Sequence, residues 1–311
     1  MHKPPNSRTE IFVEKEADNM GDFACVQAAV APLWNAPKEG AVRVDEALCG
    51  TEVEILESSG AYRRVRTAYY YEGWVLENTL FPLSSPEQWR SASKAVVCAS
   101  FADLQHEPSV QASTLCTLPR GARLRWEEAS ATDKWQKVFL PNGTPGFLPA
   151  SSLVKPFHGI GARKAPQFRC DVVRSAKSYL GTPYRWGGMT PMGIDCSGLC
   201  FMAYALNGVY IFRDARIEPG YAIEQIPFRC AGPGDLLFFP GHVAMLIGGG
   251  RYIHSTAGNG CHGVVINSLN PRSPEYRADL PRKLLAVGSL FGQKFSGQGR
   301  GKAPGRKRRV E

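Results

Sequence analysis

The chain has 311 residues, of which 43% are hydrophobic and 21% are charged. This length exceeds one typical domain of about 100–200 residues, so we expect two or three compact units. The composition excludes the fibrous, disordered and disulfide-scaffold classes of protein.

The first 20 residues contain no apolar run of the about 7–15 residues that a signal peptide needs. We therefore expect no secretion signal, and since no run reaches about 18 apolar residues we expect no membrane span. Nine cysteines, an odd number without CxxC pairs, favour a reducing compartment. These features predict a cytoplasmic protein with no membrane partner.

Two stretches after this N-terminal segment, 1–21, share short β-type runs separated by turn residues. The candidate strands are 41–44, 52–56, 62–67 and 73–76 in the first stretch and 94–100, 122–127, 135–140 and 146–149 in the second. The matching endings EGWV at 72–75 and PGFL at 145–148 predict an internal duplication. Both stretches, 22–88 and 93–155, resemble bacterial SH3-type domains, in which Gly73-Trp74 would be a packing unit or a ligand contact.

A third unit, 158–293, follows Pro156, and its sequence pattern changes from short β-type runs to helix-sized segments. Apolar spacing predicts one helix over 171–180 and another over 196–207, the second with Asp195 as its N-cap and Gly208 at its end. Short runs with Gly-rich connections predict an antiparallel meander. Its candidate strands are 235–239, 242–247, 251–255 and 263–268.

Residues 294–311 hold seven basic residues and one acid, so most of the net charge of +9 lies in this tail. The rest of the chain is nearly neutral. Its glycines and its few apolar side chains predict a disordered, solvated segment. A polyanion-binding arm is the less favoured interpretation, and we expect no nucleic-acid partner.

Cys196 opens the second predicted helix, where the helix dipole and unpaired N–H groups would favour a thiolate and the helix entry would expose the sulfur. A thiolate that cleaves an amide also needs a group to protonate the leaving amine. His242 and His254 lie in adjacent candidate strands, and antiparallel pairing would bring them side by side. His242 would then serve as base and acid, and His254 would bond its other ring nitrogen.

Metal binding is the competing interpretation of these residues. Cys196, His242, His254, Cys261 and His262 are mostly far apart in the sequence, whereas structural zinc ligands usually come in closely spaced pairs. We therefore expect no metal and no cofactor.

Five motifs together resemble the NlpC/P60 cysteine peptidases: GTPYRWGG at 181–188, DCSGL at 195–199, GDLLFF at 234–239, GHVA at 241–244 and YIHS at 252–255. The resemblance implies a papain-like α+β domain, preceded here by two small all-β SH3-type barrels. It also implies that Cys196 is the nucleophile, His242 the general base and His254 the third polar residue. Tyr184 matches the tyrosine at the oxyanion site, where a phenol could stabilise the tetrahedral intermediate, although a packing role is the alternative.

The order of domains resembles the γ-D-glutamyl-L-diamino acid endopeptidases that require a free N-terminal L-alanine. In that subgroup the first module forms one end of the cleft, and carboxylates there bind the substrate ammonium. An ammonium needs such a partner because it loses water on binding. Asp195, Ser197 and Tyr71 fall at substrate-contacting positions. Either Asp45 or Glu46 would be the acid of the first module. Arg213-Asp214 matches an element near the cleft, although an ordinary surface ion pair is an equal alternative.

These expectations predict a cysteine endopeptidase that cleaves murein (peptidoglycan) stem peptides in cell-wall recycling, through an acyl-enzyme. The alternatives are a catalytically silent wall-binding protein and an amidase or acyltransferase of the same fold. The expected partner is a murein-derived peptide, and the sequence leaves open both the diamino acid, lysine or diaminopimelate, and the oligomeric state.

Overall fold

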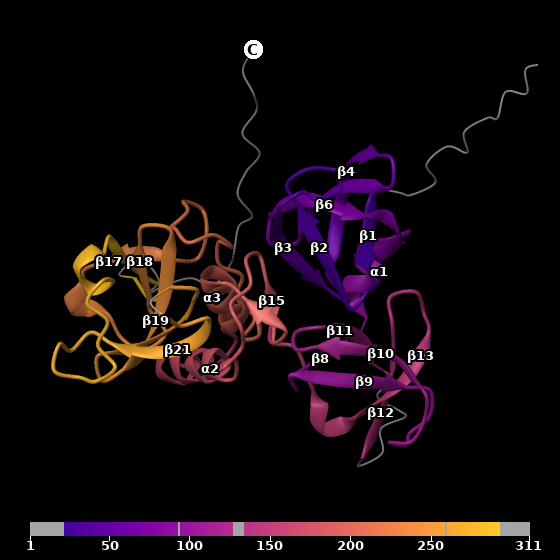
Figure 1. Ribbon diagram of the computed structural model, residues 1–311. Helices are drawn as coiled ribbons and strands as arrows, with labels where there is room; N and C mark the ends of the chain where they lie inside the picture. The colour runs from indigo at the N-terminus through magenta and orange to yellow at the C-terminus, as the bar shows by residue number, and fades with distance from the viewer. Residues whose placement is uncertain (1–21, 93, 127–133, 259, 293–311) are drawn as a thin grey trace, which may run out of the picture.

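The computed structural model describes residues 22–92, 94–126, 134–258 and 260–292. The expected N-terminal segment 1–21 and basic tail 294–311 lie outside the described residues. Figure 1 shows two small β modules, indigo and magenta, beside a larger C-terminal domain coloured orange to yellow. None of the helices in the described ranges is long and apolar enough to cross a membrane.

The first module is a seven-stranded antiparallel sheet in the order β3-β2-β6-β5-β4-β1-β7. A short helix, α1 (Pro86–Ser91), follows the sheet. Small and branched apolar side chains alternate inward along the strands and form the core of the module. The strands are β1 (Phe23–Val26), β2 (Val30–Trp34), β3 (Arg43–Leu48), β4 (Glu52–Ser59), β5 (Tyr62–Thr67), β6 (Glu72–Leu76) and β7 (Leu80–Pro82).

The second module repeats this plan, with strand order β10-β9-β13-β12-β11-β8-β14. Each strand occupies the place of the strand seven numbers earlier, so the two modules have the same topology, in agreement with the predicted duplication. The strands are β8 (Lys94–Val97), β9 (Phe101–Gln105), β10 (Thr114–Pro119), β11 (Arg123–Trp126), β12 (Trp135–Phe139), β13 (Pro145–Pro149) and β14 (Leu153–Val154).

Three strands in each module were not predicted from the sequence, namely β1, β2 and β7 in the first and β9, β10 and β14 in the second. Pro32 lies within β2, Pro82 ends β7 and Pro119 ends β10, and proline lowers the strand signal because it cannot donate to a sheet. The expected strand at 41–44 is also wrong in its bounds, since β3 starts at Arg43 and continues to Leu48. It does so through two acids, Asp45 and Glu46, which are almost completely buried because basic side chains pair with them.

The C-terminal domain is an α+β unit, as predicted, with a six-stranded antiparallel sheet in the order β17-β22-β18-β19-β20-β21. Two helices, α2 (Ala165–Lys177) and α3 (Cys196–Ala205), pack against each other and against this sheet. The first helix starts six residues before the predicted 171, with Pro166 in its first turn, where proline is favoured. The strands are β15 (Met189–Thr190), β16 (Gly193–Ile194), β17 (Glu224–Ile226), β18 (Leu236–Phe239), β19 (His242–Gly248), β20 (Arg251–Thr256), β21 (Gly263–Ser268) and β22 (Ala286–Ser289).

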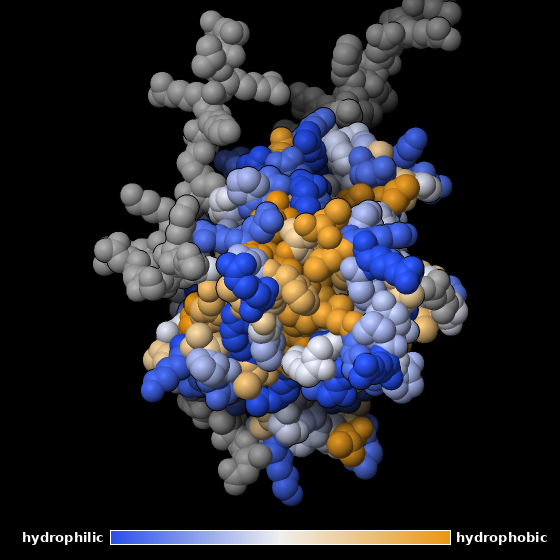
Figure 2. Space-filling model, turned by 90° about the vertical axis from the view of Figure 1, so that its left-hand side faces the viewer, coloured by the Kyte–Doolittle hydropathy of each residue, from blue (hydrophilic) through white to orange (hydrophobic). Residues whose placement is uncertain are grey.

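The large sheet buries apolar side chains on both faces. Leu236 and Phe238 join the main core with α2 and α3, while Leu237 and Phe239 alternate into a second cluster on the opposite face. Figure 2 looks onto this end of the molecule, where an apolar area lies inside a hydrophilic rim.

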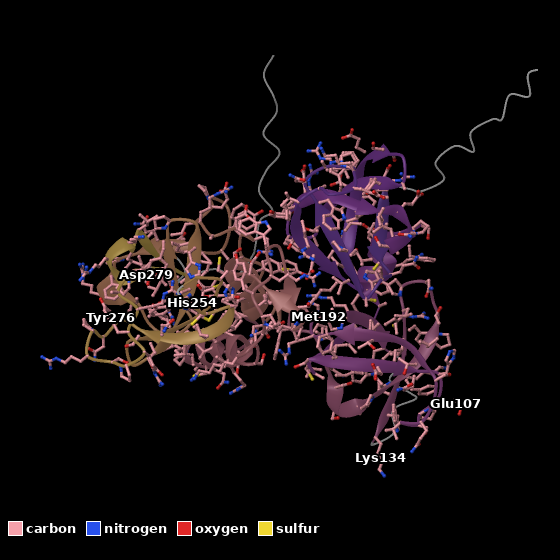
Figure 3. All side chains as sticks on the ribbon, in the orientation of Figure 1. Glu107, Lys134, Met192, His254, Tyr276 and Asp279 are labelled. Carbon is pink, nitrogen blue, oxygen red and sulfur yellow. The ribbon has the colours of Figure 1, made fainter. Side chains whose placement is uncertain are left out.

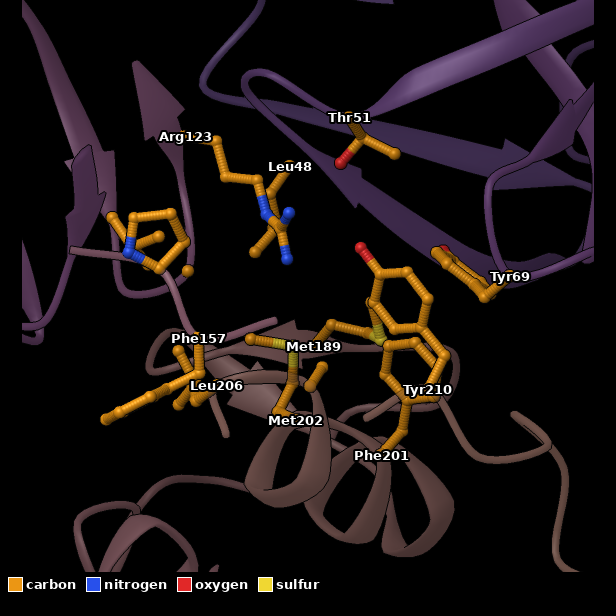
Figure 4. Close-up of a pocket in the computed structure, with 14 residues that line it drawn as sticks. Leu48, Thr51, Tyr69, Arg123, Phe157, Met189, Phe201, Met202, Leu206 and Tyr210 are labelled. Atoms are coloured by element: carbon orange, nitrogen blue, oxygen red, sulfur yellow. The ribbon is translucent and has the colours of Figure 1, made fainter. Parts of the chain in front are cut away.

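The first module and the C-terminal domain share one hydrophobic core, because Leu48 and Tyr69 pack in the same cluster as α3. The two modules also touch directly: Arg123 N–H donates to the carbonyl of Cys49 over 2.8 Å. Gly50 sits at this contact with φ +83°, and a Cβ there would lie 2.0 Å from the Arg123 carbonyl oxygen, so glycine is required. Figure 4 shows a pocket where the three units meet, and side chains from the modules face side chains of α3 across it.

Candidate active site

The first turn of α3 is fixed by its cap. Asp195 lies in an extended conformation, and its Oδ1 accepts a hydrogen bond from the Gly198 N–H over 2.6 Å. A Cβ on Gly198 would lie 2.4 Å from the Gly188 carbonyl oxygen, so the preceding turn packs directly against the helix backbone. Cys196 is therefore held as the first residue of the helix, as predicted.

Cys196 is only 7% exposed, so the expectation that the helix entry would expose its sulfur is wrong. Burial, followed by the charge of Asp195, raises the pKa of the thiol to about 11. Backbone N–H groups of Val243 and Ser197 hydrogen-bond the sulfur and oppose this shift, but burial outweighs them. The resting group at neutral pH is a thiol that lies against the first residues of β19.

His242 opens β19, and its Nε2 lies 2.8 Å from Nδ1 of His254 on the neighbouring strand β20. The two rings are therefore side by side, as antiparallel pairing predicted. Burial lowers the pKa of His242 to about 3 and that of His254 to about 4, so both rings are neutral at pH 7. The other ring nitrogen of His254, Nε2, lies 2.8 Å from Oδ1 of Asn267. Figure 3 shows His254 within the C-terminal domain.

A cleft of about 360 Å³ opens above Cys196. It is built from both the first module and the C-terminal domain. Four other residues predicted for the site line it together with Cys196, namely Tyr71, Tyr184, Asp195 and Ser197. The remaining lining residues are Val44, Trp186, Arg213, Asp214, Ala215, Arg216 and Gly241. Gly241 directly precedes His242 in the chain, whereas His242 and His254 are not among the described residues that line the cleft.

Known proteins resemble this chain both in part and along most of its length. The model of the NlpC/P60 family matches residues 181–279. Dipeptidyl-peptidase 6 of Lysinibacillus sphaericus is 43% identical over 272 residues, which cover 86% of this chain and 99% of that protein. The chain belongs to the NlpC/P60 family.

This NlpC/P60 protein is accordingly a cysteine peptidase. It is also similar to the gamma-D-glutamyl-L-lysine dipeptidyl-peptidase of Bacillus cereus, at 28% identity over 68% of this chain and 66% of that protein. A crystal structure of an NlpC/P60 family protein from Bacillus cereus has the same fold, with a TM-score of 0.70 and 24% identity over 85% of this chain and 98% of that one.

Tyr184 is half-buried at the side of the NlpC/P60 cleft. Burial and the neighbouring Cys196 and Asp195 raise the pKa of its phenol to about 12. The hydroxyl therefore keeps its proton at neutral pH and is available as a hydrogen-bond donor.

Tyr71 reaches from the first module across to the C-terminal domain. Its hydroxyl donates to Oδ1 of Asp214 over 3.3 Å and also lies 3.4 Å from the carbonyl oxygen of Val44. The Asp214 side chain is 41% exposed, so its carboxylate is accessible from the cleft. This end of the cleft thus combines an aromatic wall with a carboxylate whose other oxygen lies 3.8 Å from Nη1 of Arg216.

Arg213 is 2% exposed, so the interpretation of Arg213-Asp214 as a surface ion pair is wrong. Its Nε lies 2.7 Å from Oδ1 of Asp45 in the first module, and its Nη1 lies 3.1 Å from Oδ1 of Asp195. The same Nη1 donates to the Ser197 hydroxyl over 2.8 Å. One buried guanidinium therefore connects the first module to the cap of α3.

Asp45 and Glu46, the two candidates for the acid that meets the substrate, are not among the described residues that line the cleft. Asp45 accepts from the Tyr69 hydroxyl over 2.6 Å as well as from Arg213, and burial raises its pKa to about 6 despite the arginine. Glu46 accepts from the Met189 N–H over 2.9 Å and pairs with Arg43 at 3.3 Å. Both acids hold the first module against the C-terminal domain, and Asp214 is the accessible carboxylate instead.

Sequence reasoning missed two members of the site. Trp186 lines the cleft and is 62% exposed. Asn267 hydrogen-bonds His254. Asn267 lies in a strand 13 residues beyond His254 with no motif around it, so only the pairing of β20 with β21 reveals its role. Among the described residues, no group of three or more His, Cys, Asp or Glu could hold a metal ion.

Proposed function

We propose that this peptidase hydrolyses the amide bond between γ-D-glutamate and the following L-diamino acid in murein stem peptides that carry a free N-terminal L-alanine. The observation that supports this best is the end of the cleft, where Tyr71 of the first module meets Asp214 close to the cysteine. We propose that the short N-terminal segment ahead of the scissile bond binds at this end. The relatives named as dipeptidyl-peptidases are in keeping with release of a dipeptide.

In the first half of the reaction, His242 Nδ1, the ring nitrogen that does not face His254, accepts the Cys196 proton. The sulfur attacks the γ-carbonyl carbon, and the negative charge on the former carbonyl oxygen is stabilised by the Cys196 backbone N–H and the Tyr184 hydroxyl. His242 then returns the proton to the departing amine of the diamino acid. The products of this step are a thioester on Cys196 and a free amino group.

In the second half, water adds to the thioester. His242 takes a proton from this water as it attacks, and the Cys196 sulfur leaves and recovers the proton. The released product is L-Ala-γ-D-Glu. His254 bonds the far side of the His242 ring throughout and so keeps its orientation.

The substrate ammonium is the group that we expect at the end of the cleft formed by Tyr71 and Asp214. A cation that loses water there needs an anionic partner, and the Asp214 carboxylate, held by the Tyr71 hydroxyl, supplies it. Asp195 and Ser197 line the cleft closer to the sulfur, and their side chains are ordered by Arg213. We assign them to the glutamyl portion of the substrate.

The setting that we propose is recycling of wall fragments in the cytoplasm. All nine cysteines lie in the described ranges and are free thiols, which is the usual state in a reducing compartment. We also propose that the two β modules are of bacterial SH3 type, on the basis of their shared seven-strand order and small apolar cores.

Cleavage of matched peptides tests the proposed substrate. L-Ala-γ-D-Glu-L-Lys and the corresponding diaminopimelate peptide would be supplied with free and with acetylated N-termini, and the products would be identified by mass spectrometry. We expect release of L-Ala-γ-D-Glu from the free peptides and little cleavage of the acetylated ones. Equal cleavage of both forms would disprove recognition of the ammonium, and cleavage at another bond would disprove the assigned specificity.

A further inference from the structure

Asn267 on β21 has a defined orientation beside the histidine pair. Its Nδ2 donates to the Glu275 carbonyl oxygen over 2.9 Å, and a carbonyl accepts only from the NH₂ side of an amide. The Oδ1 atom therefore faces His254 Nε2, 2.8 Å away. Since Oδ1 is only an acceptor, His254 Nε2 must carry a proton.

This single bond determines the protons of both rings. A neutral imidazole has one N–H, so His254 Nδ1 is left with a lone pair. The 2.8 Å contact to His242 Nε2 then requires that the proton of this contact belongs to His242. His242 Nδ1 consequently has the free lone pair, and it is the atom required to accept a proton from Cys196.

Burial is the main cause that favours neutral rings, since of the two charged side chains that act on both histidines Arg277 lowers their pKa and Asp279 raises it. Arg277 and Asp279, from the segment after β21, are the nearest charged side chains and pair with each other at 2.8 Å. Arg277 also donates to the Thr256 hydroxyl over 3.1 Å. Cys196 is a thiol at neutral pH, and the Tyr252 ring packs 5.2 Å from the His254 ring. Figure 3 shows Asp279 and Tyr276 on the same side of the domain as His254.

We propose that Asn267 is a positioning residue that fixes the tautomers of His254 and His242, so that His242 Nδ1 is free to receive the Cys196 proton. This inference rests on the proposed roles of Cys196 and His242. It assigns to a neutral amide the orienting task that a carboxylate performs in other triads.

Two substitutions separate this role from a merely structural one, because both remove the bond to Glu275. Asn267→Leu also removes the acceptor, so His254 can protonate Nδ1 and force the His242 proton onto the wrong nitrogen. We expect kcat to fall about 10–100-fold with little change in KM. Asn267→Asp keeps an acceptor and should retain most of kcat in the pH range of maximal rate, with the acidic limb of its pH profile moved upward.

Tyr252→Phe is the matched control. Its ring packs 5.2 Å from the His254 ring, and its buried hydroxyl has no hydrogen-bond partner within the described ranges, so kcat should be unchanged. Equal losses for Asn267→Leu and Asn267→Asp would overturn the proposal, since they would reflect only the lost bond to Glu275.

Nitrogen-15 spectra of the imidazoles test the tautomers without any substrate. The resting protein should show both His242 and His254 protonated at Nε2 near pH 7, and Asn267→Leu should lose this pattern. A resting His242 protonated at Nδ1 would overturn the proposal directly. If the spectra agree but no murein peptide is cleaved, the proposed substrate fails while the tautomer assignment stands.

Discussion

At the scale of single residues, burial is the main influence on the pKa values of the two proposed reacting groups. Cys196 and His242 are both withdrawn from water, and each is held in its neutral form, with the pKa of the thiol raised and that of the imidazole lowered. These two shifts favour a thiol and a neutral imidazole over a thiolate and an imidazolium. We therefore expect the proton to move when substrate is attacked.

The rate of alkylation of Cys196 should reflect this resting state. Because only the thiolate reacts and the pKa is about 11, reaction with iodoacetamide should accelerate about tenfold per pH unit from about pH 7 to about pH 10. Peptide mass spectrometry would follow Cys196, with the exposed Cys170 and Cys230 as accessible thiols in the same sample. A rate that is already constant near neutral pH would indicate a thiolate–imidazolium pair and contradict this prediction.

Asp214→Asn should affect only substrates that carry a free amine. Loss of one charged hydrogen-bond partner corresponds to about 1.5–3 kcal/mol, so kcat/KM for L-Ala-γ-D-Glu-L-Lys should fall about 10–100-fold. The already slow cleavage of the acetylated peptide should not change further. Glu218→Gln is the control, since Glu218 is an acid of the same segment that pairs with Arg216 at 2.9 Å. Equal effects of Asp214→Asn on both peptides would exclude ammonium recognition by this carboxylate.

At the scale of elements, the start of α3 combines a cap with a close backbone contact. The Asp195 cap was readable from the sequence because an acid before an apolar helix is a common N-terminal signal. The need for glycine at position 198 was not readable from the sequence. The atom that excludes a side chain there is the carbonyl oxygen of Gly188, in the turn before β15. Sequence spacing does not show such a contact.

Gly198→Ala should displace the first turn of α3 and with it Cys196, the proposed nucleophile. Its Cβ would lie 2.4 Å from a backbone oxygen, and overpacking of this kind typically costs about 1–3 kcal/mol of unfolding free energy. We expect lower stability in urea titrations together with reduced kcat. Gly232→Ala is the control, because the nearest neighbour of its added methyl is 3.6 Å away at the end of a flexible side chain. Unchanged stability and kcat in Gly198→Ala would show that the turn at Gly188 can move to accommodate the methyl group.

At the scale of the whole molecule, the first module contributes directly to the candidate active site. It supplies Tyr71 and Val44 to the cleft, and Asp45 to the buried pair with Arg213. Its Leu48 and Tyr69 pack in the core of the C-terminal domain. The cleft exists as described only when the two units are docked.

Removal of Arg213 tests this connection. Arg213→Met leaves two buried carboxylates without their cation, and breaking such a pair costs about 3–5 kcal/mol. In an Asp45→Asn background the same substitution should lower the free energy of unfolding by at least about 1 kcal/mol less, because only one unpaired carboxylate then remains. Urea unfolding of the four proteins would measure this coupling. Arg216→Met, at a 60% exposed site, should change stability by no more than about 0.5 kcal/mol.

Equal costs of Arg213→Met in the two backgrounds would show that Arg213 and Asp45 stabilise the protein independently. The connection between the first module and the α3 cap would then rest on apolar packing alone.

The sequence by itself determined the β character of both modules, the helix that starts at Cys196, and the pairing of His242 with His254. These features depend on local periodicity, capping and short antiparallel connections, which neighbouring residues encode. The tertiary structure alone decided the charge state of Cys196, the burial of Arg213 and Asp45, and the contribution of Asn267. Each of these depends on the loss of water or on a contact between distant segments, and burial reverses the preferences that an exposed residue would have.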